Sequence, residues 1–140
     1  MTCTRLSGRG FSGIVCTTPD FKPGDQAPEG YLAWHEWAER AAKAGMSGKD
    51  IDTIARDIIT NEGYGEYFGH GLGHGIGLEV HEEPRVSQIN TNALPVGAVV
   101  TIEPGIYLPN RFGVRIENDI FLGLETTEVL TVFPTDLIIV

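Results

Sequence analysis

The chain of 140 residues is long enough for one modest domain, since a single core at this length can bury roughly two-thirds of the unfolded surface. Its 41% apolar and 21% charged residues are near the averages for globular proteins and exclude a disordered, collagen-like or coiled-coil class. The net charge of -9 argues against a nucleic-acid partner, and no apolar run reaches the roughly 18 residues of a membrane span, so we expect a soluble, cytoplasmic protein that binds neither nucleic acid nor membrane.

The first 28 residues are rich in Gly, Ser, Thr and Pro, which predicts an irregular amino-terminal segment. Residues 11–16 could form a strand, although Gly13 weakens it. Cys3 and Cys16 lack the Cys-x-x-Cys spacing of metal or redox sites, so free thiols are the preferred interpretation. A disulfide between them would require an oxidising compartment.

Residues 29–44 carry apolar side chains at steps of three and four, the pattern of an amphipathic helix. These side chains are Tyr31, Trp34, Trp37, Ala38, Ala41 and Ala42. Both Trp residues are interpreted as core, and Gly45 is predicted to be the C-cap.

A second helix is predicted to begin at Ser47, because Asp50 three positions later makes a variant capping box ahead of an Ile-rich run. Residues 61–63 end this helix. Beyond them the sequence becomes Gly-rich and β-branched, and it predicts strands at 98–102, 113–117, 119–122 and 128–133. Helices followed by strands in blocks indicate an α+β fold in which two helices pack on an antiparallel sheet.

Three of the four His residues fall within twelve positions, at His70, His74 and His81; the fourth, His35, lies on the first predicted helix. Imidazole binds transition metals and moves protons near neutral pH, so this clustering indicates a functional site. A single His in a Gly-rich loop is nevertheless more often a hydrogen-bonding or surface residue.

Two carboxylates downstream strengthen that interpretation. Glu103 follows an apolar strand and precedes Pro104, and Glu117 ends another apolar strand. Burying an unpaired carboxylate costs several kcal/mol, so both need a partner such as a metal ion. The alternatives are a surface acid for Glu103 and a same-face ion pair between Arg115 and Glu117.

Three motifs in this order resemble the pita-bread metallopeptidases, most closely aminopeptidase P and prolidase and more distantly methionine aminopeptidase and creatinase. They are Gly-His-Gly-Leu-Gly-His-Gly-Ile-Gly-Leu-Glu-Val-His-Glu, Thr-Ile-Glu-Pro-Gly-Ile-Tyr and Val-Arg-Ile-Glu-Asn-Asp-Ile. The resemblance covers about residues 41–133. It implies that residues 1–140 form one partial peptidase domain, in which 29–140 are the carboxy-terminal half of a pita-bread fold with a curved sheet.

In that family two divalent ions, usually Mn, Co or Zn, are held by two Asp, one His and two Glu. The resemblance implies that His74, Glu103 and Glu117 are metal ligands in this chain. They would be three of the five ligands that the family pattern requires.

The resemblance also implies roles for three residues around the ions. His70 and His81 would contact substrate and handle protons. Arg115 would steady Glu117 and the network of the site. The implied reaction is metal-dependent hydrolysis of a peptide whose second residue is Pro.

The two Asp ligands of the family lie upstream of the helix pair, and residues 1–28 lack their expected surroundings. The first five residues, Met-Thr-Cys-Thr-Arg, look like the second Asp motif with its Asp missing. We therefore expect a truncated form with an incomplete site, inactive alone, which forms a homo-oligomer or binds a partner chain that supplies the missing half. The alternative is a non-catalytic pita-bread module that binds a peptide or protein.

Overall fold

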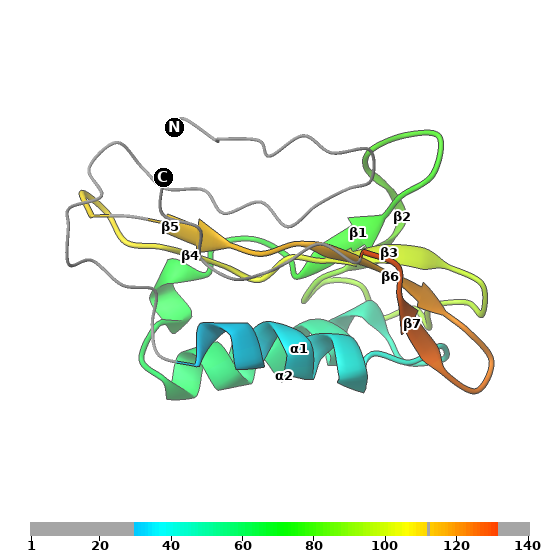
Figure 1. Cartoon of the computed structure of the whole chain (residues 1–140), viewed down its shortest axis with the longest axis horizontal. Coiled ribbons are helices and arrows are strands. Elements are labelled where there is room, and N and C mark those ends of the chain that lie inside the picture. The colour runs from blue at the N-terminus through cyan, green and yellow to red at the C-terminus, as the bar shows by residue number, and fades with distance from the viewer. Residues whose placement is uncertain (1–29, 112, 132–140) are drawn as a thin grey trace.

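Two helices lie side by side against one face of an antiparallel sheet (Figure 1). The computed structural model describes residues 30–111 and 113–131. The helices are α1 (Tyr31–Ala41) and α2 (Gly48–Asn61), followed by the short 3-10 helix η1 (Gly65–Tyr67). The strands are β1 (Gly73–Gly75), β2 (Glu82–Val86), β3 (Val99–Ile102), β4 (Gly105–Tyr107), β5 (Gly113–Arg115), β6 (Asn118–Leu122) and β7 (Thr127–Val129).

The predicted capping box of α2 is confirmed. The backbone N–H of Asp50 donates to Ser47 Oγ over 3.1 Å, and the backbone N–H of Ser47 donates to the Asp50 carboxylate over 3.4 Å. The predicted C-cap of α1 is wrong, because the helix ends at Ala41 with Ala42 as its cap. Gly45 instead takes a left-handed φ of 87° in the connection to α2, where its N–H donates to the carbonyl of Leu94.

The core assignment is confirmed for Trp34 and wrong for Trp37. The side chain of Trp34 is buried, whereas Trp37 is 65% exposed. At about 100° per residue, Trp37 lies roughly 130° around the helix axis from the middle of the buried face. A Trp at a three-residue step from another apolar residue therefore satisfied the pattern without lying on the buried face.

The predicted α+β class is confirmed. Five strands form one sheet in the order β2-β1-β3-β6-β7, and β4 pairs with β5 in a second, two-stranded sheet. The strands predicted at 98–102 and 119–122 match β3 and β6, while β5 ends before the predicted residue 117. Of the strand predicted at 128–133, β7 includes 128–129, residues 130–131 are not in a strand, and 132–133 lie outside the described residues. Strands β1, β2 and β4 were not predicted, because each is short and Gly-rich or Pro-containing.

The core lies between the helices and the sheet. It is made by Tyr31, Trp34, Ala38 and Ala42 of α1 and its cap, Ile51, Ala55 and Ile59 of α2, and apolar residues of the strands, among them Val100, Ile102, Ile106, Ile120 and Leu122. None of the helices in the described part of the chain has the length and apolar character that a membrane crossing requires. The predicted strand at 11–16 and both Cys residues lie outside the described residues.

Candidate metal centre

The two downstream carboxylates lie opposite each other at a break in a long hairpin. Ile102 pairs with Asn118 in the β3–β6 ladder, and Gly105 pairs with Arg115 in the β4–β5 ladder, both antiparallel. This common register places Glu103 across from Glu117 in the gap between the two ladders. The prediction that each Glu ends or interrupts an apolar strand is therefore confirmed.

His74 is brought to the same place by β1, which pairs with β3. The glycines on either side of His74 allow this close approach. A Cβ on Gly73 would lie 1.8 Å from the carbonyl oxygen of Thr101, and a Cβ on Gly75 would lie 2.3 Å from that of Glu83. Larger residues at either position would push β1 away from its neighbours.

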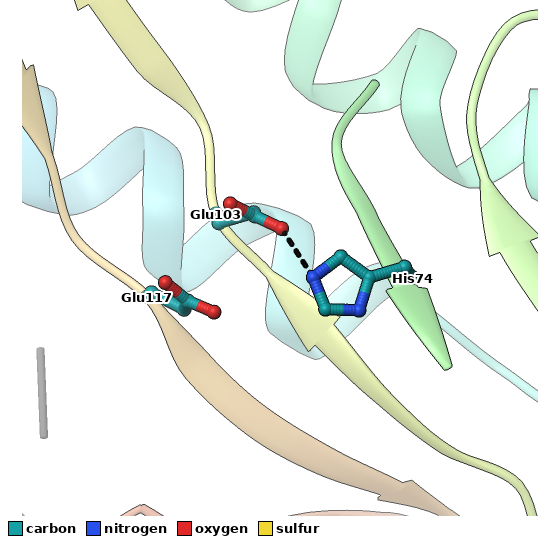
Figure 2. A group of neighbouring side chains, drawn as sticks. All are labelled: His74, Glu103 and Glu117. Carbon is teal, nitrogen blue, oxygen red and sulfur yellow. Dashed lines mark ion pairs between the residues drawn. The ribbon is translucent and has the colours of Figure 1, made fainter. Parts of the chain in front are cut away.

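The structure brings the three predicted metal ligands together. One ligand atom from each of His74, Glu103 and Glu117 lies within 4.8 Å of the other two. Figure 2 shows them on three neighbouring strand segments, with a dashed line for the ion pair of His74 and Glu103. The Nε2 atom of His74 lies 3.0 Å from Oε1 of Glu103. His74 and Glu103 are buried and Glu117 is partly buried.

The electrostatics of this group are those of two crowded carboxylates beside one imidazole. Burial alone would raise the pKa of Glu103, but the hydrogen bond from His74 and the charges of His74 and Arg115 outweigh burial and hold the pKa below its usual range. Burial and the neighbouring charge of Glu103 raise the pKa of Glu117. The hydrogen bond to Glu103 raises the pKa of His74. A cation among the three would relieve the repulsion between the carboxylates.

The donor set fits a divalent metal. The Nδ1 atom of His74 lies 3.0 Å from the carbonyl oxygen of Gly75, and a carbonyl oxygen can only accept, so Nδ1 carries a proton. Nε2 then remains as the coordinating atom on the side of Glu103 and Glu117. Metal-binding His residues commonly have one ring nitrogen fixed by a backbone carbonyl in this way.

Arg115 lies against both carboxylates. Its Nε atom is 3.8 Å from Glu103 Oε2, and one terminal nitrogen is 3.6 Å from Glu117 Oε2. The same-face pair of Arg115 and Glu117 is therefore present. It coexists with the cluster of ligand atoms and is not an alternative to it.

The other two His residues predicted for the site lie in different surroundings. The exposed ring of His81 packs edge-on against His74, with 4.4 Å between the ring centroids. The Nε2 atom of His70 instead shares a 3.1 Å hydrogen bond with the Tyr107 hydroxyl, and the His70 ring packs against Phe68. A pocket of about 440 Å³ beside His70 is also lined by Arg56, Phe68 and Ile89.

The sequence interpretation missed a buried ion pair that fixes the start of the His segment. Asp52 and Arg56, one turn apart on α2, form two hydrogen bonds of 2.7 and 3.0 Å. Arg56 also donates to the carbonyls of Phe68 and His70, and Asp52 accepts from the N–H of Leu72. An Asp four positions before an Arg, on the apolar face of the predicted helix, was the available signal.

Residues 14–123 match the model of metallopeptidase family M24. The chain belongs to this family. A Xaa-Pro dipeptidase of Pyrococcus horikoshii is 54% identical over 130 residues, which are 91% of this chain and 37% of that protein. Membership of family M24 implies a divalent-metal site, in agreement with the chemistry of the donor set.

Two solved structures of Xaa-Pro or X-Pro peptidases are similar to this chain. A Xaa-Pro dipeptidase from Bacillus anthracis has a TM-score of 0.78 and 43% identity, and the match covers 86% of this chain and 36% of the dipeptidase. An X-Pro aminopeptidase from Thermotoga maritima has a TM-score of 0.78 and 42% identity, and the match covers 91% of this chain and 40% of the aminopeptidase. The resemblance to the pita-bread peptidases is confirmed, and the M24 chain spans roughly a third of the length of these relatives.

Proposed function

We propose that this M24 chain carries the carboxy-terminal part of a two-metal site that hydrolyses amino-terminal Xaa-Pro peptide bonds. The convergence of His74, Glu103 and Glu117 supports this proposal, because three potential ligand atoms from three strand segments lie within 4.8 Å of one another. The relatives whose names specify a Xaa-Pro or X-Pro peptidase support the substrate class.

In this proposal His74 provides Nε2 and the two Glu residues provide carboxylate oxygens to the ions. Bound divalent ions, Mn, Co or Zn in the resembling family, would lower the pKa of a water molecule and polarise the scissile carbonyl. Three ligands are sufficient to hold one ion with an open position, whereas a second ion needs further carboxylates. We propose that the two Asp ligands come from a part of the enzyme outside the described residues or from a partner chain.

The three surrounding residues have distinct proposed roles. His81 lies on the exposed side of His74, so its imidazole can exchange protons with a peptide that enters from solvent. Arg115 neutralises part of the charge of Glu103 and Glu117 and fixes their orientation. His70, tied to the Tyr107 hydroxyl, contacts the substrate further from the ions.

Calorimetric titration of Mn²⁺ and Zn²⁺ into the metal-stripped chain tests this proposal. We expect His74→Ala and Glu117→Ala to abolish the binding that the unsubstituted chain shows, because each change removes a ligand. His81→Ala is the matched control and should retain the metal. Unchanged affinity in both ligand variants would remove these residues from the ligand set.

Hydrolysis of Xaa-Pro dipeptides separates the peptidase from the non-catalytic module. Two tightly bound equivalents of metal together with release of free Pro would support the complete site, and His81→Ala should then lose hydrolysis but keep metal. Zero or one weakly bound equivalent with no hydrolysis would mean that this chain is inactive by itself. Addition of the remaining part of a related peptidase would then show whether the missing ligands restore activity.

A further inference from the structure

Three polar side chains on the buried face of α1 have no part in the proposed chemistry. Tyr31, His35 and Glu39 follow one another at intervals of four residues, so they form a single stripe along the helix. All three are buried. A polar group in this position is costly unless it is hydrogen-bonded, and the partners of the stripe are therefore informative.

Tyr31 bridges the two strand segments that carry the carboxylate ligands. Its hydroxyl donates to the carbonyl of Pro104, and the backbone N–H of Ile116 donates to the same hydroxyl over 3.2 Å. Pro104 follows Glu103 in the chain, and Ile116 precedes Glu117. One side chain thus holds one neighbour of each ligand.

His35 and Glu39 reach the two remaining neighbours. The Nε2 of His35 donates to the carbonyl of Ile102, 3.0 Å away, because a carbonyl oxygen can only accept. Glu39 accepts a 2.7 Å hydrogen bond from the side-chain amide of Asn118. The stripe therefore contacts all four residues that flank the two carboxylates. Figure 2 shows the helices behind the strands, on the face of the sheet opposite to the one that carries the His74 side chain.

We propose that Tyr31, His35 and Glu39 are positioning residues that set the separation of the Glu103 and Glu117 carboxylates for metal binding. These carboxylates lie in the gap between the β3–β6 and β4–β5 ladders, where strand pairing alone does not fix their spacing. The stripe supplies fixed contacts on either side of that gap. The metal-binding part of this inference rests on the proposed function.

Outer groups of this kind typically change metal affinity 10- to 100-fold when they are removed. The first test compares Glu39→Ala with Glu39→Gln, because Gln keeps an oxygen that can accept from the Asn118 amide. Ile59→Val is the control, since it trims a buried side chain of α2 that makes no polar contact with the flanking residues. Circular dichroism establishes that each variant is folded before titration.

We expect Glu39→Ala to weaken Mn²⁺ binding by about 10-fold or more. Glu39→Gln should restore the affinity, and Ile59→Val should leave it unchanged. A folded Glu39→Ala variant with the original affinity, or an equal loss in Ile59→Val, would overturn the proposal. If Glu39→Ala does not fold, Tyr31→Phe replaces it with the same expected loss, and normal affinity in that variant overturns the proposal as well.

A metal-free measurement separates this inference from the proposed function. If the unsubstituted chain binds no Mn²⁺, the carbon-bound ring-proton signal of His74, whose Nε2 atom lies 3.0 Å from Oε1 of Glu103, is followed by nuclear magnetic resonance. A signal that disappears or shifts in Glu39→Ala but persists in Glu39→Gln and Ile59→Val supports positioning without metal. A signal unchanged in Glu39→Ala shows that the stripe does not position Glu103.

Discussion

Replacing Arg56 by Met should destabilise the chain more than any comparable change at its surface. Met keeps an aliphatic side chain of similar length but removes the guanidinium group from Asp52, whose side chain is 0% exposed. Breaking a buried ion pair by removing one partner costs about 3 to 5 kcal/mol, because the other charge remains buried without compensation. The carbonyls of Phe68 and His70 lose their donors in the same step.

For a chain of this size, that loss corresponds to a fall of about 10 to 15 °C in the melting temperature. Urea unfolding followed by circular dichroism measures the free energy of unfolding directly. The matched control is Arg40→Met on α1, which removes an exposed ion pair with Glu36 at the same spacing of four residues. Exposed pairs contribute about 0 to 1 kcal/mol, so this control should change stability little.

The double variant Asp52→Leu with Arg56→Met tests the physical reason. Removing both charges avoids the uncompensated carboxylate, and the cost added relative to Arg56→Met is about 1 to 3 kcal/mol for the orphaned N–H of Leu72. The double variant should therefore be more stable than Arg56→Met alone. A loss below about 1 kcal/mol in the single variant, or a double variant that is the less stable of the two, would refute the reasoning.

Three further predictions test other parts of the structure. Trp37→Ser should change the free energy of unfolding by less than about 0.5 kcal/mol, whereas Trp34→Ala should cost about 3 to 5 kcal/mol in urea unfolding. Gly73→Ala should prevent folding or strongly lower the melting temperature, because its Cβ would overlap the Thr101 carbonyl. Burial lowers the pKa of His35 below its ordinary 6.5, despite nearby acids, so its contribution to stability is complete above pH 6.5 and is lost as the pH falls below it. Urea unfolding between pH 7.5 and 5.5 should show this fall, and His35→Gln should flatten it.

The parts of the fold that could be predicted are those with local signals. The capping box at Ser47 and the Ile-rich stripe behind it located α2, since both act within a few residues of the chain. The apolar runs that became β3 and β6 were long enough to show β-branched enrichment. The Gly-rich strand β1 gave no such signal, because its pairing depends on the absence of side chains at Gly73 and Gly75.

The candidate site was predicted from motif order, whereas its geometry depends on tertiary contacts. His74 lies far from Glu103 and Glu117 in the sequence, and the pairing of β1 with β3 brings the ligand atoms of the three residues within 4.8 Å of one another. The stripe of α1 was missed for a related reason. A helix pattern scored by apolar residues ignores buried polar residues such as His35 and Glu39, although they lie on the same face as the core.

The break in the hairpin explains how one short segment can present two carboxylates to the same point. In a continuous ladder, Glu103 and Glu117 would be a directly opposed pair of like charges, which is unfavourable. Here the opposed carboxylates are held in place by ion pairs with Arg115 and His74 and by the hydrogen bonds of α1 to the residues that flank them. The protein thus stabilises an arrangement of acids that would otherwise repel. Burial and the charge of Glu103 together raise the pKa of Glu117, and a cation between the two carboxylates would relieve both effects.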